Sequence, residues 1–189
     1  MPPQPFVSLP TQENLEDSLC VPSGHAGFAL GQEGRQRLEC GTHAMQPLSP
    51  AVVFLVRVGA SHVLELTSLG NSMLRDNGGQ WQPLRVLGHL EYSIAQPERL
   101  MDALERDAIL EASEFERELT RIVLDCVNSF LECDTWRAET LSASLECASG
   151  ELQVHVEEAL GPLGIQLQSF ELSTHVGTTE TTSRPHGLA

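Results

Sequence analysis

The residues of this sequence whose spacing best suits metal chemistry are Cys40 and His43, which form a C-x-x-H segment. A thiolate and an imidazole placed in this way can supply two zinc ligands, but a structural zinc site needs four. Two further cysteines, Cys126 and Cys133, lie on an apolar helical pattern, where thiols usually act as small core side chains. The sequence therefore predicts neither a metal site nor another cofactor.

Histidines in two predicted strands are candidate general bases. His89 lies on the face of its strand opposite the apolar residues, whereas His62 shares the apolar face of its own strand. We therefore interpret His89 as an exposed side chain and His62 as a buried one, which is simpler than a role for either as a catalytic base. Ser72 and Asp76 would complete a hydrolase-like set with His89, but the sequence contains no G-x-S-x-G nucleophile elbow. We therefore expect no catalytic residues.

Acidic side chains gather on the predicted helices. They include Glu111, Glu114, Glu116, Glu118, Glu157 and Glu158. A solvated helix face is the simpler explanation of this pattern, because such acids mainly favour solubility. The alternative is a docking surface for a basic partner.

Length and charge narrow the class of protein. The 189 residues are enough for one domain with a hydrophobic core. All 11 basic residues are arginine, against 26 acids, and the net charge is -15. The absence of lysine excludes Schiff-base chemistry on lysine and a P-loop lysine. The excess of acid repels phosphate groups, so we expect no nucleic-acid partner.

The cysteines and the apolar runs of the sequence indicate the cellular compartment in which the protein is expected. Five cysteines without a C-x-x-C pair do not suit a disulfide framework, and a reducing environment fits them better. The first residues lack the basic and apolar regions of a signal peptide. The longest apolar run, residues 51–56, is far shorter than the roughly 20 residues of a membrane-spanning helix. We expect a cytoplasmic protein.

The elements that would position these residues follow from hydrophobic periodicity and turn signals. Strands are expected over residues 26–30, 35–39, 51–58, 61–67, 80–94 and 165–172. Turns are expected at residues 41–43 and at residues 75–79, directly before the long strand. Helices are expected from Pro97, from a capping box at Ser113 and Glu116, and over residues 138–160. This order predicts an α+β fold, a mostly antiparallel sheet with two or three helices and a C-terminal strand.

The ends of the chain differ in composition from its middle. Residues 1–20 are rich in proline and polar residues, and we expect a flexible N-terminal arm. Residues 21–173 would form the domain. Residues 174–189, rich in serine and threonine, would form a disordered tail.

Several short motifs, in order along residues 21–172, resemble the SPFH or band 7 domain of stomatin, prohibitin and flotillin. The matching positions are Gly24, Gly41, His43, Asp76, Asn77, Gly78, Tyr92, Pro97, Gly164 and Ile165. Asn77 and Gln96 stand where the family pattern has aspartate. The resemblance, closest to the shorter soluble members, implies an SPFH-like fold in which these ten residues have structural roles.

The same resemblance implies a function. SPFH proteins are scaffolds, so we expect a non-enzymatic interaction module that forms homo-oligomers and organises partner proteins. Peripheral membrane association would then arise only through a partner protein. The alternative hypothesis is a soluble metal-dependent or hydrolytic enzyme that uses Cys40, His43 and His89.

Overall fold

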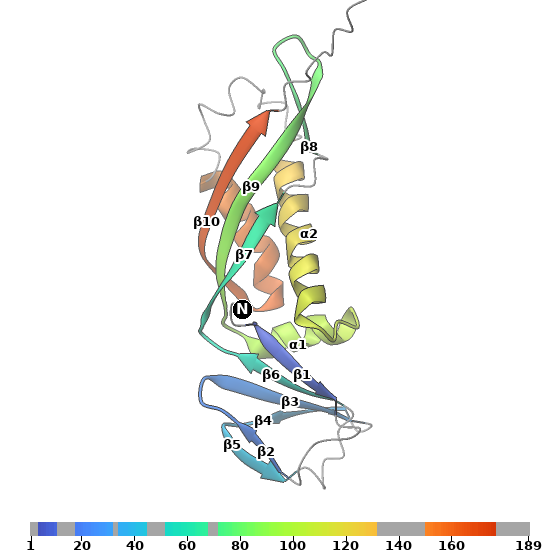
Figure 1. Cartoon of the computed structure of the whole chain (residues 1–189), viewed down its shortest axis with the longest axis vertical. Helices are drawn as coiled ribbons and strands as arrows, with labels where there is room; N and C mark the ends of the chain where they lie inside the picture. Colours follow the sequence, from blue (N-terminus) through green and yellow to red (C-terminus); the bar gives the residue numbers. More distant parts are fainter. Residues whose placement is uncertain are drawn as a thin grey trace, which may run out of the picture.

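The computed structural model describes residues 4–10, 18–31, 34–44, 52–67, 72–131 and 150–176 (Figure 1). The strands are β1 (Phe6–Pro10), β2 (Ser18–Val21), β3 (His25–Gly31), β4 (Gly34–Leu38), β5 (Gly41–Ala44), β6 (Val52–Arg57), β7 (Ser61–Thr67), β8 (Ser72–Arg75), β9 (Trp81–Ile94) and β10 (Ile165–Val176). The helices are α1 (Pro97–Arg106), α2 (Ala112–Leu131), a helical segment over residues 150–160 and the 3₁₀ turn η1 (Gly161–Leu163). Every described strand pair is antiparallel, so the predicted α+β class is confirmed.

Strand β9 is the centre of the long sheet. It pairs with β10 along one edge and with β7 and β8 along the other. Its side chains alternate as predicted: Leu90, Tyr92 and Ile94 are buried, while His89 lies half-exposed on the opposite face. The predicted burial of His62 is also confirmed, and its ring lies 5.5 Å from that of Tyr92.

The described helices all pack against one face of this sheet (Figure 1). Apolar residues of α2 at helical spacing pack with those of the 150–160 segment and the sheet. The buried helical residues are Phe115, Leu119, Val123, Val127, Phe130, Leu152, Val156 and Leu160. Cys126 is half-buried at the border of this core, and Cys133 lies outside the described residues. None of the helices within the described ranges is long and apolar enough to cross a membrane.

The short strands form two further sheets at the other end of the molecule. One has the order β1-β6-β3-β4, and the other consists of β2 and β5 (Figure 1). Strand β6 is buried on both faces, since Phe54 and Val56 join the main core and Val53 joins a second cluster against β2. This placement explains the nearly continuous apolar run over residues 51–58.

Three sequence-based expectations about the edges of the domain are wrong. Residues 6–10 and 18–20 do not form a loose arm, because they lie in β1 and β2 and the side chain of Phe6 is only 1% exposed. Residues 41–43, expected as a turn, lie in β5. Residues 174–176, assigned to the tail, extend β10 along β9, while residues 177–189 lie outside the described ranges. In each case a distant strand supplies backbone partners that local composition does not reveal.

The start of α2 differs from the predicted capping box. Helix α2 begins at Ala112, so Ser113 lies inside its first turn and donates a hydrogen bond to Glu111. Glu114, rather than Glu116, reaches back, and its carboxylate accepts from the amides of Leu110 and Glu111. The carboxylate end of a capping box is therefore present two residues earlier than predicted.

Gly164 joins the end of the helical layer to the end of β9. Its carbonyl accepts hydrogen bonds from the amides of Ala95 and Gln96, and the next residue, Ile165, pairs with Ile94. Its φ of +72° is left-handed, and a Cβ atom there would lie 2.1 Å from the carbonyl oxygen of Gln96. Only glycine fits this position without strain.

Candidate functional site

The structure separates the residues of the enzyme hypothesis. Cys40 is exposed directly before β5, and His43 lies within β5 with its Nε2 2.6 Å from the carbonyl oxygen of Glu39. His89 lies on β9, in a different sheet from β5. These side chains do not meet in one site. Among the residues that the structure describes, no three His, Cys, Asp or Glu side chains are grouped as a metal ion would require.

His89 instead belongs to a row of polar side chains on the face of the long sheet opposite the described helices. Glu65 and Glu171 flank it on the neighbouring strands, and its Nε2 is 3.7 Å from Oε2 of Glu171. In the next row, Glu91 accepts hydrogen bonds of 2.5 and 3.2 Å from serine hydroxyls of both neighbouring strands. Cross-strand contacts of this kind contribute about 0.2–1 kcal/mol each, so they support the sheet rather than define a site.

Asp76 also has a structural role, at the turn before β9. Its carboxylate accepts hydrogen bonds from the backbone amide of Gln80 at 2.8 Å and from the side chain of Gln82 at 3.0 Å. These hydrogen bonds lower the pKa of Asp76. Asn77 and Gly78 occupy the turn itself. The predicted turn before β9 is therefore confirmed, and Asp76 holds it closed.

Gly24, Gly41 and Pro97, which also belong to the motif pattern, lie at junctions, whereas Tyr92 lies in the core. The carbonyl of Gly24 accepts a hydrogen bond from Val58, which connects the β2–β3 turn to the end of β6. Gly41 opens β5 with a φ of +136°. Pro97 is the first residue of α1, as predicted, and is buried. Burial raises the pKa of Tyr92, whose ring lies in the core.

Two hollows lined by described residues adjoin the loop between α1 and α2, residues 107–111. This loop contains Ala108, whose φ of +53° is left-handed and uncommon for a residue with a Cβ atom. Ile109 is half-buried, and Leu110 is 50% exposed. Because Leu110 is exposed and also lines one of these hollows, this loop is a candidate contact surface.

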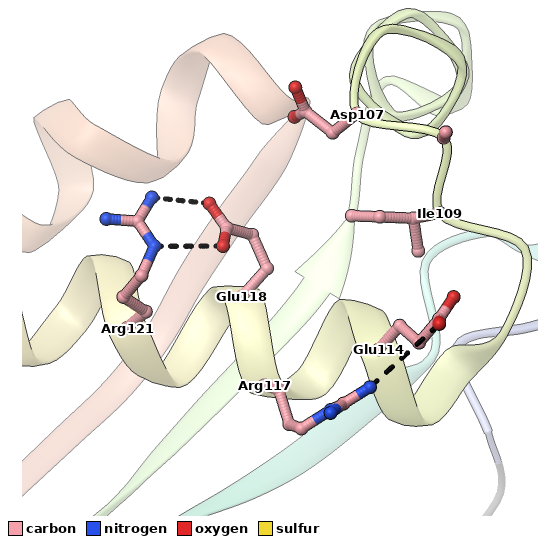
Figure 2. A pocket seen from close by; sticks show the side chains of 7 residues that line it. Asp107, Ile109, Glu114, Arg117, Glu118 and Arg121 are labelled. Atoms are coloured by element: carbon pink, nitrogen blue, oxygen red, sulfur yellow. Dashed lines mark hydrogen bonds and ion pairs between the residues drawn. The ribbon is translucent and has the colours of Figure 1, made fainter.

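The first hollow is charged and has a volume of about 580 Å³. Figure 2 shows Ile109 between the end of α1 and helix α2, with the charged side chains of α2 along one wall. Arg121 forms a two-pronged ion pair with Glu118, at 2.5 and 2.9 Å, and also binds Asp125. Arg117 lies 3.9 Å from Glu114. These arginines are already engaged by carboxylates.

The second hollow is smaller, about 280 Å³, and mainly apolar. It lies between the β3–β4 hairpin and the α1–α2 loop. Its lining includes Leu30, Phe54, Leu104, Ile109 and Leu110. Its volume is close to the lower end of the usual range for small-molecule sites, about 300–1,000 Å³, so it has room for one large side chain.

Acidic groups outnumber arginines around the second hollow. On its rim, Arg35 of β4 forms ion pairs with both Asp102 and Glu105 of α1, at 2.6 and 3.0 Å. One guanidinium against two carboxylates leaves one unit of negative charge. Asp107 adds another acid, which Arg106 neutralises through two hydrogen bonds that lower its pKa. The rim therefore favours a positively charged ligand group.

We call this second hollow and its acidic rim the loop groove, defined by Leu30, Arg35, Phe54, Asp102, Leu104, Glu105, Ile109 and Leu110. The acidic docking surface considered from the sequence, residues 105–158, shares Glu105, Ile109 and Leu110 with the groove but does not include the part that the strands contribute. The groove joins residues more than 60 positions apart. The only local signal was the apolar pair Ile109-Leu110 between two acids, Asp107 and Glu111.

The fold defines the class of this protein only coarsely, as an α+β domain with antiparallel sheets. No protein-family model matches the sequence, and no curated protein matches it either.

Proposed function

We propose that this protein is a non-enzymatic interaction module of the SPFH type, which self-associates and organises partner proteins in the cytoplasm. The observation that carries the proposal is the loop groove, an apolar hollow with an acidic rim and an exposed leucine at its edge. Such a surface is typical of protein contacts, in which an apolar centre is surrounded by charged groups. A homo-oligomer is the simplest assembly that satisfies the proposal.

The resemblance of the sequence to SPFH domains supports the same function. The positions that carry this resemblance, such as Gly164, Pro97 and Asp76, hold junctions and turns in the structure. Because residues with such roles hold the fold together, we assign the proposed function to exposed surfaces instead. Membrane association belongs to the proposal only through a partner.

Multi-angle light scattering over a series of protein concentrations tests this function. We expect the average mass to rise above 20.6 kDa, the mass of one chain, as concentration increases. A protein that remains at the mass of one chain up to the highest soluble concentration would contradict self-association.

A further inference from the structure

The tip of the β8–β9 hairpin presents an apolar face with one positive charge. The register places Met73 opposite Pro83 and Arg75 opposite Trp81, so these four side chains share one face of the hairpin. Met73 is 43% exposed and Trp81 is 53% exposed, whereas the intervening Leu74 is buried. We call Met73, Arg75, Trp81 and Pro83 the hairpin tip.

Arg75 and Trp81 form a preorganised pair. The guanidinium carbon of Arg75 lies 4.7 Å from the centre of the Trp81 ring, within the range of a cation–π contact. No described carboxylate forms an ion pair with Arg75, in contrast to Arg35 and Arg121. Tryptophan, arginine and methionine are among the side chains enriched in protein interfaces. The composition of the hairpin tip thus suits a protein contact.

The hairpin tip and the loop groove complement each other. The tip offers a large aromatic ring beside a positive charge, and the groove offers an apolar hollow for one large side chain with excess negative charge on its rim. They lie far apart along the long axis of the molecule, the hairpin at one end and the α1–α2 loop toward the other (Figure 1). One copy therefore cannot join its own tip to its own groove.

We propose that the hairpin tip of one copy docks in the loop groove of a second copy, with Trp81 in the hollow and Arg75 facing Asp102 and Glu105. This inference rests on the proposed self-association and names its surfaces. Because the two halves of the contact differ, it is heterologous. It propagates head to tail, into a ring if the rotation closes and into a filament if it does not.

Two substitutions each remove one half of the contact. Trp81→Ala removes the docked ring, and Leu110→Arg places a positive charge at the edge of the groove. Both side chains are about half exposed, so the fold should survive both changes. Each variant alone should stay at the mass of one chain in light scattering where the natural protein associates, with association weakened about tenfold or more.

Mixing the two variants is the decisive experiment. The Leu110→Arg copy keeps an intact tip, and the Trp81→Ala copy keeps an intact groove. An equimolar mixture should therefore form a dimer with one copy of each and grow no further. A mixture that remains at the mass of one chain overturns the proposal, as does a natural level of association in both single variants.

Control variants separate this contact from others. Val154→Ala and Val154→Arg match the apolar loss and the charge gain at another half-exposed apolar residue, and should associate normally. Gln166→Lys combined with Gln168→Lys places charge on the edge strand β10 and should also have no effect. If this edge variant alone blocks association, the head-to-tail contact is overturned while the proposed function stands. If the natural protein never associates, both fail.

A charge reversal at Arg75 tests the contact between the hairpin tip and the loop groove without the Leu110→Arg variant. Arg75→Glu should be repelled by the rim acids and weaken association, and its deficit should shrink at high salt because screening reduces the repulsion. If Arg75→Glu associates as strongly as the natural protein at low salt, the assigned role of Arg75 is contradicted.

Discussion

The carbonyl oxygen of Gly164 accepts a hydrogen bond of 3.0 Å from the backbone amide of Gln96, and so ties the start of β10 to the residue before α1. The same carbonyl accepts from Ala95 at 2.9 Å. This contact closes the end of the long sheet at the point where β9 turns into α1. The backbone at Gln96 passes so close to Gly164 that glycine is the only residue that fits this position.

Gly164→Ala should destabilise the protein by about 1–3 kcal/mol, because alanine would adopt a left-handed conformation. The carbonyl oxygen of Gln96 adds to this cost, since it would lie only 2.1 Å from the new Cβ atom. Urea denaturation measures the change. Gly161→Ala is the matched control, since a Cβ atom there meets nothing within 4 Å, and its effect should stay within about 0.5 kcal/mol.

Phe6→Ala tests whether the N-terminal strand belongs to the core. The Phe6 ring lies 5.7 Å from that of Phe54 and 5.8 Å from that of Phe115, so truncation should cost about 3–5 kcal/mol of unfolding free energy. The neighbouring Val7 is largely exposed, and Val7→Ala should change little. Equal effects of the two substitutions would favour the loose arm expected from composition.

Asp76 should make the β8–β9 hairpin sensitive to acid. Its hydrogen bonds from Gln82 and Gln80 lower its pKa in the folded protein below the ordinary value of 3.8. The stabilisation is therefore fully present above that ordinary pKa and is lost as the pH falls through the lowered one. Titration of the Asp76 carboxyl by NMR should give a midpoint below 3.8. In Asp76→Asn, the amide of Gln80 should exchange faster at neutral pH, and the acid dependence of the hairpin should disappear.

Ala108→Gly should leave the protein as stable as before or more stable, by up to about 1 kcal/mol. Glycine removes the cost of a left-handed alanine, roughly 1–2 kcal/mol, although it also makes the unfolded chain more flexible. Thermal unfolding measures the difference. Ala95→Gly is a control without positive φ, so it should be neutral or destabilising. A clear loss of stability in Ala108→Gly would contradict strain at this loop.

Local patterns were sufficient to predict most elements of the fold. Alternation along β9, the turn at Asp76 and the proline at the start of α1 are confirmed within a few residues. Each depends on interactions between residues close in sequence: side-chain period, turn hydrogen bonds and the fixed φ of proline. The shifted start of α2 is a local error of the same scale, because several acids near Glu114 can fill the capping position.

The sequence by itself determined the α+β class, the order of its central elements and the acidic, lysine-free surface. Only the tertiary structure decided that residues 6–10 form a strand on β6 and that β6 and β7, neighbours in the chain, belong to different sheets. It alone brought Leu30 of β3 beside Leu104 and Leu110 to form the loop groove. The reason is that strand pairing and hollows depend on which distant segments are available as partners, and the local period of a sequence does not encode this choice.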